Sequence, residues 1–78
     1  MTHQKQLVLH NDDKHDVNFV RACLIRYCKH DFTQAEQCVI ITHGVGKCSV
    51  KQGDIMDLLE IQKSLEENGL KTELISMN

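Results

Sequence analysis

The chain has 78 residues, of which 9 are basic and 11 acidic, and a formal net charge of −2. This length makes a single domain, residues 1–78, with a small core, and we expect residues 1–5 to form a short flexible N-terminus. There is no basic patch and there are only three aromatic residues, which argues against nucleic-acid binding. No apolar run approaches the ~18 residues of a membrane-spanning helix, and no signal peptide is recognisable. A cytoplasmic location without membrane contact is therefore expected.

The four cysteines stand apart from one another, each inside an apolar segment: Cys23, Cys28, Cys38 and Cys48. A zinc site usually draws its ligands from close pairs, whereas an isolated free cysteine packs as a small hydrophobic residue. We therefore expect buried, reduced thiols and no cofactor.

The first part of the chain predicts a strand followed by a helix. Residues 6–10 alternate polar and apolar side chains, which is typical of a strand with one buried face. Asn11-Asp12-Asp13 ends this strand, since Asn and Asp favour turns and caps. Apolar residues then recur at helical spacing and predict a helix from about Asp16 to Lys29.

A second helix is predicted from Thr33 to His43. Thr33-Gln34-Ala35-Glu36 resembles a capping box, and the following apolar block indicates a helix buried on most sides. Glycine in residues 44–46 ends it with a left-handed cap.

Residues 47–51 alternate and predict a second strand. Asp54 is then the N-cap of a third helix, one face of which consists of Ile55, Leu58, Leu59, Gln62 and Leu65. Gly69 is its expected C-cap, and residues 70–77 form the last strand. The order β-α-α-β-α-β predicts an α+β, two-layer domain with helices packed on one face of a small three-stranded sheet.

The polar residues between the elements allow more than one interpretation. Asn11 to Asp13 form either a turn with a helix cap or a cluster of acceptors that grips a cation. His43 alone is explained by a structural hydrogen bond, and with Asp12 and Asp13 it makes a weak metal signature. No nucleophile is placed with a base and an orienting group, so an enzyme is not indicated.

Three motifs together resemble the ClpS family, the adaptors of the Clp protease system that recognise N-degrons. They are Leu-His-Asn-Asp-Asp at 9–13, Gln-Ala-Glu-Gln-Cys at 34–38 and Thr-His-Gly-Val-Gly-Lys-Cys at 42–48. The resemblance covers roughly residues 6–75, and the predicted order of elements is also that of the family.

The resemblance implies a role for eight residues. Asn11, Asp12 and His43 would hold the free α-amino group of a substrate. The hydrophobic pocket and its rim, which take a large apolar first side chain, would consist of Asp13, His15, Val17, Val39 and Thr42. Packing in the core is the alternative explanation for Val17 and Val39.

The resemblance also implies a non-enzymatic adaptor that hands N-degron substrates of the N-end rule to a Clp AAA+ unfoldase of the ClpA or ClpC type. This chain departs from many relatives by carrying His15 in place of Thr or Asn, and the small Val17 in place of a larger gate residue. The alternative is an interaction domain of similar fold, as in ribosomal stalk proteins, without an N-degron pocket.

Overall fold

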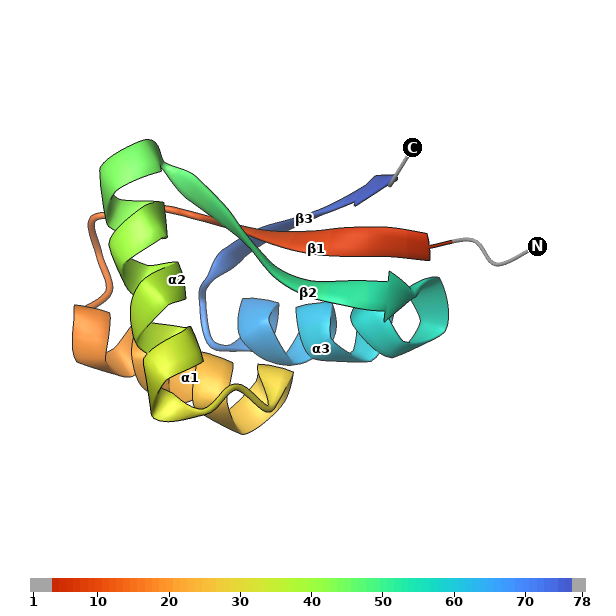
Figure 1. Ribbon diagram of the computed structural model, residues 1–78, viewed down its shortest axis with the longest axis horizontal. Helices are drawn as coiled ribbons and strands as arrows, with labels where there is room; N and C mark the ends of the chain where they lie inside the picture. The colour runs from red at the N-terminus through yellow and green to blue at the C-terminus, as the bar shows by residue number, and fades with distance from the viewer. Residues whose placement is uncertain (1–3, 77–78) are drawn as a thin grey trace.

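The computed structural model describes residues 4–76 and has the order β-α-α-β-α-β (Figure 1). The elements are β1 Gln4–His10, α1 Val17–Cys28, α2 Phe32–Val45, β2 Lys47–Asp54, α3 Ile55–Glu67 and β3 Lys71–Ser76. The predicted α+β fold with a three-stranded sheet is confirmed. Among residues 4–76, no helix has the length and apolar character needed to cross a membrane.

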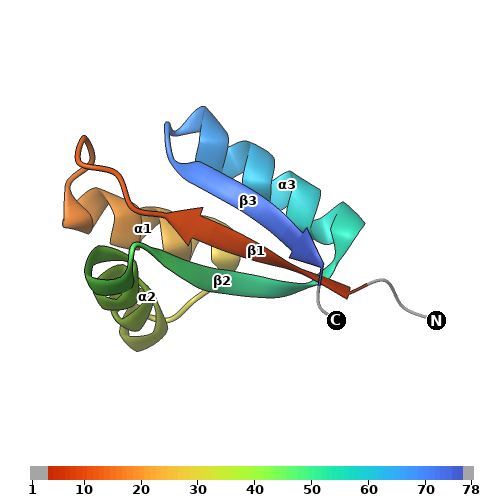
Figure 2. The ribbon, with the colours of Figure 1, turned by 90° about the horizontal axis from the view of Figure 1, so that it is seen from above.

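β1 is the central strand and runs antiparallel to both β2 and β3 (Figure 2). Leu7 and Leu9 belong to the hydrophobic core, as the alternating pattern predicts. Val8 points to the other face of the sheet, yet it is only 4% exposed. The expectation of one buried face is wrong because β2 and β3 flank the strand on both sides.

Several element boundaries differ from those predicted. β1 already includes residues 4–5, which were expected to be flexible, while residues 1–3 lie outside the described part of the chain. β2 continues to Asp54 instead of stopping at Lys51, because its pairing with β1 extends to its last residue. Met77, the predicted end of the last strand, also lies outside the described residues.

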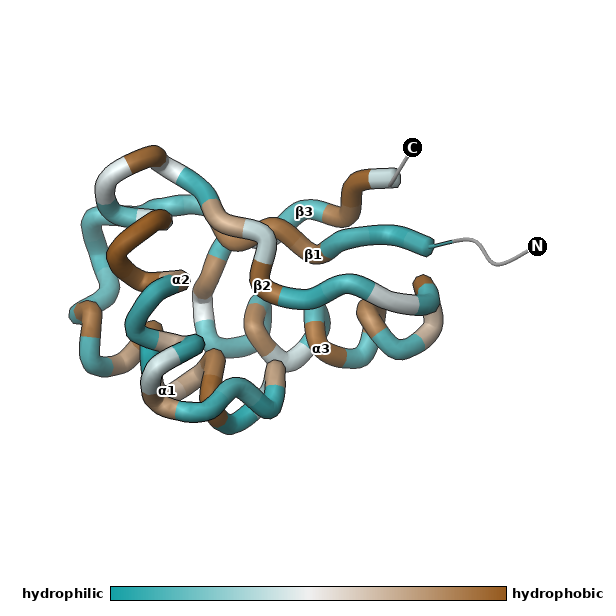
Figure 3. Tube along the Cα trace, viewed as in Figure 1, coloured by the Kyte–Doolittle hydropathy of each residue, from teal (hydrophilic) through white to brown (hydrophobic). Residues whose placement is uncertain are grey.

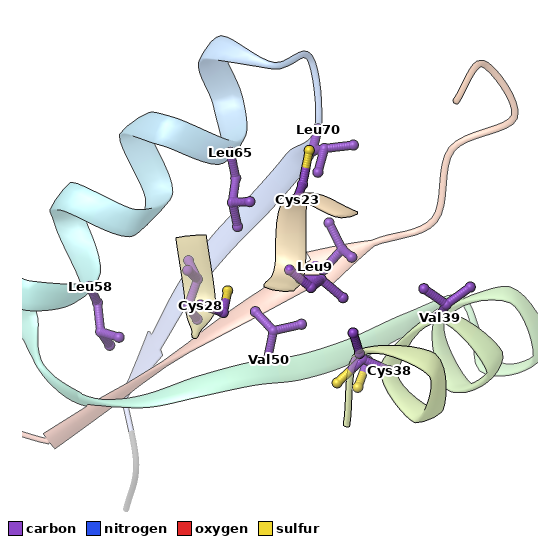
Figure 4. Packing of buried hydrophobic residues seen from close by; sticks show 13 residues of the cluster. Leu9, Cys23, Cys28, Cys38, Val39, Val50, Leu58, Leu65 and Leu70 are labelled. Atoms are coloured by element: carbon purple, nitrogen blue, oxygen red, sulfur yellow. The ribbon is translucent and has the colours of Figure 1, made fainter. Parts of the chain in front are cut away.

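The core lies between the sheet and the helices (Figure 4). Its buried residues are Leu7, Leu9, Cys23, Leu24, Cys28, Ala35, Cys38, Val39, Cys48, Val50, Leu58, Leu65 and Leu70. All four cysteines are free and buried, which confirms the expected burial of their thiols. Burial raises the pKa of Cys28 to about 11 and that of Cys38 to about 12, so both thiols are uncharged at neutral pH.

α2 is buried on one side only, and the prediction of burial on most sides is wrong. Its buried residues are Ala35, Cys38, Val39 and Thr42. Much of the helix is coloured as hydrophobic in Figure 3, yet Ile40 is 56% exposed and Val45 is 74% exposed. The reason is the position of α2, which rises beside the end of the sheet while α1 and α3 lie beneath it (Figure 1).

The capping box of α2 lies two residues before the predicted one. The N–H of Gln34 donates to Oδ1 of Asp31 at 2.7 Å, and the N–H of Asp31 donates to Oε1 of Gln34 at 3.1 Å. The helix therefore begins at Phe32, and Thr33 and Glu36 lie within its first turns.

Two further caps, at the ends of β2 and α2, lie where the sequence predicts them, and the C-terminal cap of α3 is displaced by one residue. Asp54 caps α3 by accepting the N–H of Met56 at 3.1 Å. Gly46 ends α2 in the left-handed region with φ 104°. At the end of α3 the C-cap is Asn68, and Gly69 follows with φ 87°, so the left-handed residue is the predicted glycine but one position beyond the cap.

These caps predict which substitution weakens α2. Asp31→Ala removes one half of the capping box and should lower the free energy of unfolding by about 1 kcal/mol. Thr33→Ala, at the position predicted from sequence, should change it by less than about 0.5 kcal/mol. Urea titration of both variants measures the difference. Equal losses would contradict the assignment of the cap to Asp31.

Candidate functional site

The end of β1 and the end of α2 meet, although they are far apart in the sequence. The N–H of Asn11 donates to the carbonyl oxygen of Gly46 at 2.9 Å, and His10 pairs with Lys47 in the sheet. The loop that follows β1 is therefore held against the last turn of α2, which carries His43.

A pocket of about 210 Å³ opens at this junction. Its lining residues are Leu9, His10, Asn11, Asp12, Asp13, His15, Val17, Val20, Val39, Thr42, His43 and Leu70. All eight residues singled out from the sequence are in this set. The structure thus brings together residues from the β1–α1 loop, α1 and α2, while their individual roles remain a prediction.

The polar end of the pocket has side chains free to bind a ligand. Asn11, Asp13 and His43 are exposed, and none of their side chains makes a hydrogen bond within residues 4–76. An amide oxygen, a carboxylate and an imidazole are therefore available at one place.

Asp12 differs because its carboxylate also organises the loop. Oδ1 accepts the N–H of Lys14 at 2.9 Å and that of His15 at 3.0 Å, and the ring of His15 lies 2.9 Å from Oδ2. Burial by itself raises the pKa of Asp12, but the hydrogen bonds from His15 and Lys14 outweigh it, so the pKa is lower than its ordinary value of 3.8. The turn interpretation of the triplet is thus correct for Asp12, without excluding a binding role.

Several of the side chains that line the pocket are apolar. Val39 is 8% exposed and lies one helical turn before His43, so both side chains line the same hollow. Val17, at the first position of α1, is 46% exposed at the pocket. Thr42 is buried, and its hydroxyl donates to the carbonyl oxygen of Cys38 at 2.6 Å, which satisfies it within the helix.

Four lining residues were not singled out from the sequence: Leu9, His10, Val20 and Leu70. Val20 belongs to the apolar stripe predicted for α1 and could have been chosen as a neighbour of Val17. Leu70 follows α3, and no local pattern connects it with the β1–α1 loop. The side chain of His10 pairs with that of Glu73, whose carboxylate lies 2.9 Å from Nε2.

This arrangement favours a ligand that is cationic at one end and apolar at the other. A carboxylate, an amide oxygen and an imidazole nitrogen can accept several N–H bonds from one cation. Within residues 4–76, no three His, Cys, Asp or Glu side chains are close enough together to hold a metal ion. The fold and the site thus define a small α+β domain with a mainly apolar pocket that also carries several polar side chains.

Comparison with known proteins identifies the family. The family model "ATP-dependent Clp protease adaptor protein ClpS" matches residues 2–73, and the chain therefore belongs to the ClpS family of Clp protease adaptors. The structure of Agrobacterium tumefaciens ClpS2 bound to L-phenylalaninamide is similar, with a TM-score of 0.83 and 17% identity over 99% of this chain and 100% of that one. At this identity the likeness shows the fold. A search of curated proteins by sequence gave no match.

The pKa of Asp12 predicts a pH-dependent contribution to stability. Because its pKa is lower in the folded chain than in the unfolded one, the contribution is fully present above the ordinary value of 3.8 and is lost as the pH falls through the folded value. Asp12→Asn should lower the free energy of unfolding at neutral pH by on the order of 1 kcal/mol, and this difference should shrink in strong acid.

Urea titrations at several pH values measure this difference. Asp13→Asn is the matched control, because the neighbouring Asp13 side chain makes no such hydrogen bond within residues 4–76. A loss for Asp12→Asn that stays constant into strong acid would contradict the prediction.

Proposed function

We propose that this chain binds proteins through a free N-terminus whose first residue carries a large apolar side chain. The observation that supports this function is the convergence of Asn11, Asp12 and His43 with the apolar wall of one pocket. An N-terminal residue has the matching chemistry, since its ammonium group and its side chain leave the same Cα in different directions.

The polar end would bind the ammonium group. An α-ammonium carries three N–H donors and one positive charge, which match the amide oxygen of Asn11, the carboxylate of Asp12 and an unprotonated nitrogen of His43. Acetylation would remove the charge and two of the donors. Binding should therefore require a free N-terminus.

The apolar end would hold the first side chain. Val17, Val39 and Thr42 line the same pocket as Leu9, Val20 and Leu70, and we assign Asp13 and His15 to its rim. Phenylalaninamide, the ligand of the Agrobacterium ClpS2 structure, combines a free amino group with a large aromatic side chain. It has the chemistry of an N-terminal phenylalanine, which supports the proposal for this related chain.

In this function the chain recognises the N-degron and a Clp AAA+ unfoldase of the ClpA or ClpC type receives the substrate. ATP hydrolysis and proteolysis belong to the unfoldase and its protease, so the adaptor needs no catalytic group or cofactor. Such an adaptor would work in the cytoplasm. An interaction domain like those of ribosomal stalk proteins would not need the three polar residues to converge, which makes it the weaker alternative.

The proposal predicts selective binding of peptides with a free N-terminus. A peptide that begins with Leu or Phe and is labelled near its C-terminus should bind in a fluorescence-anisotropy titration. Its N-acetylated twin should bind at least tenfold more weakly, because a charged hydrogen-bonding group is lost.

Two protein variants complete this experiment. Asp12→Ala should weaken binding of the free peptide by at least about tenfold. The matched control is Asp57→Ala, which removes a carboxylate from the first turn of α3, away from the pocket (Figure 1). Equal binding of the free and acetylated peptides would refute the proposed function.

The small side chain of Val17 leads to a prediction about which N-terminal residues of a peptide bind best. Its short side chain leaves the mouth of the pocket wide, so a first residue branched at Cβ, such as Ile, should bind nearly as well as Leu. Val17→Met would narrow the mouth and should shift the preference toward Leu by about tenfold or more, the usual effect of one or two carbon atoms in a pocket. Anisotropy titrations with peptides that differ only in Leu or Ile measure this ratio. A strong preference of the unaltered protein for Leu would contradict the prediction.

A further inference from the structure

The imidazole of His15 is held by three neighbours. Its Nδ1 lies 3.0 Å from Oδ1 and 2.9 Å from Oδ2 of Asp12. Its ring stacks on Phe19, with 5.3 Å between the centroids and 17° between the planes. The opposite edge of the ring rests against Gly69, where a Cβ atom would lie only 2.9 Å from Nε2. A rim residue that simply borders a ligand would not need these contacts.

The contact with Asp12 determines which nitrogen of the ring carries a proton. An ionised carboxylate can only accept hydrogen bonds, so Nδ1 must carry the proton that it shares with Asp12. Nε2 faces the α3–β3 turn at Gly69. The ring therefore acts as a donor toward Asp12.

The hydrogen bonds of Asp12 divide unequally between its two oxygens. Oδ1 accepts the backbone N–H of Lys14, the backbone N–H of His15 and a share of the Nδ1 proton. Oδ2 accepts only from Nδ1. Since a carboxylate oxygen has two lone pairs, the free acceptor capacity lies on Oδ2.

We propose that His15 is a positioning residue, which fixes the carboxylate of Asp12 so that Oδ2 remains available to the ammonium group of the ligand. This inference rests on the proposed function, and it assigns to His15 an effect on binding that passes through Asp12. Because Nδ1 carries a proton and donates it to Asp12, this atom cannot accept a hydrogen bond from an ammonium group.

The same ring connects the two ends of the pocket. Gly69 directly precedes Leu70, which lines the apolar end and is 3% exposed. A Cβ at Gly69 would lie too close to the ring and would force it to shift, and the φ of 87° also favours glycine. The α3–β3 turn thereby supports the loop that carries Asp12.

Two variants of nearly the same shape isolate the hydrogen bond. His15→Leu and His15→Asn both remove the stacked ring and leave side chains with the same number of heavy atoms and the same branching, but only Asn retains an N–H at the position of Nδ1. Binding of a labelled peptide with a free N-terminal Leu should be about tenfold weaker for His15→Leu than for His15→Asn. Thermal unfolding verifies that both variants fold.

A second measurement needs no ligand. NMR titration of the Asp12 carboxyl group should show a pKa that rises toward 3.8 in His15→Leu and stays low in His15→Asn. If the unaltered protein binds no peptide, the proposed function fails while this titration still tests whether His15 controls Asp12. Equal binding by the two variants, or an Asp12 titration that is the same in both, would overturn the positioning role.

Discussion

The pocket depends on one backbone hydrogen bond, from the N–H of Asn11 to the carbonyl oxygen of Gly46. Gly46 ends α2 in the left-handed region and turns the chain into β2, which pairs antiparallel with β1. The last residue of β1 therefore lies beside the first residue of β2, and the loop after β1 lies beside the last turn of α2. The side chains of Asn11 and His43 reach one hollow because both positions are tied to this junction.

The pocket is also an extension of the hydrophobic core. Leu9, Val39 and Leu70 are core residues and at the same time line the pocket. Close-packed core residues move little, so a ligand would meet a wall that is already formed. In a chain of 78 residues the core is small, and a binding site can share its residues without needing a second layer of structure.

Asp12 combines a structural role with the role proposed in binding. Its Oδ1 atom closes the turn through two backbone N–H groups, while Oδ2 retains acceptor capacity. The two roles do not compete, because a carboxylate offers about four lone-pair positions. From the sequence, the triplet could form either a turn or a binding site. At Asp12 these two roles are compatible.

Much of the architecture can be predicted from the amino-acid sequence: the order of the elements, the cap at Asp54, a glycine at the end of α2 and the burial of the cysteines. The elements and their caps follow from local patterns, since periodicity and capping chemistry act over a few neighbouring residues. The pocket residues came instead from the family resemblance, and their roles are still predictions.

How far each element is buried depends on its packing against segments that are distant in the sequence. Val8 is covered because β1 is the central strand, whereas Ile40 and Val45 stay exposed because α2 stands at the end of the sheet. The contacts of His15 with Asp12 and Gly69 likewise join a loop to a distant turn. Such features depend on which segments become neighbours in space, and no pattern along the chain records that.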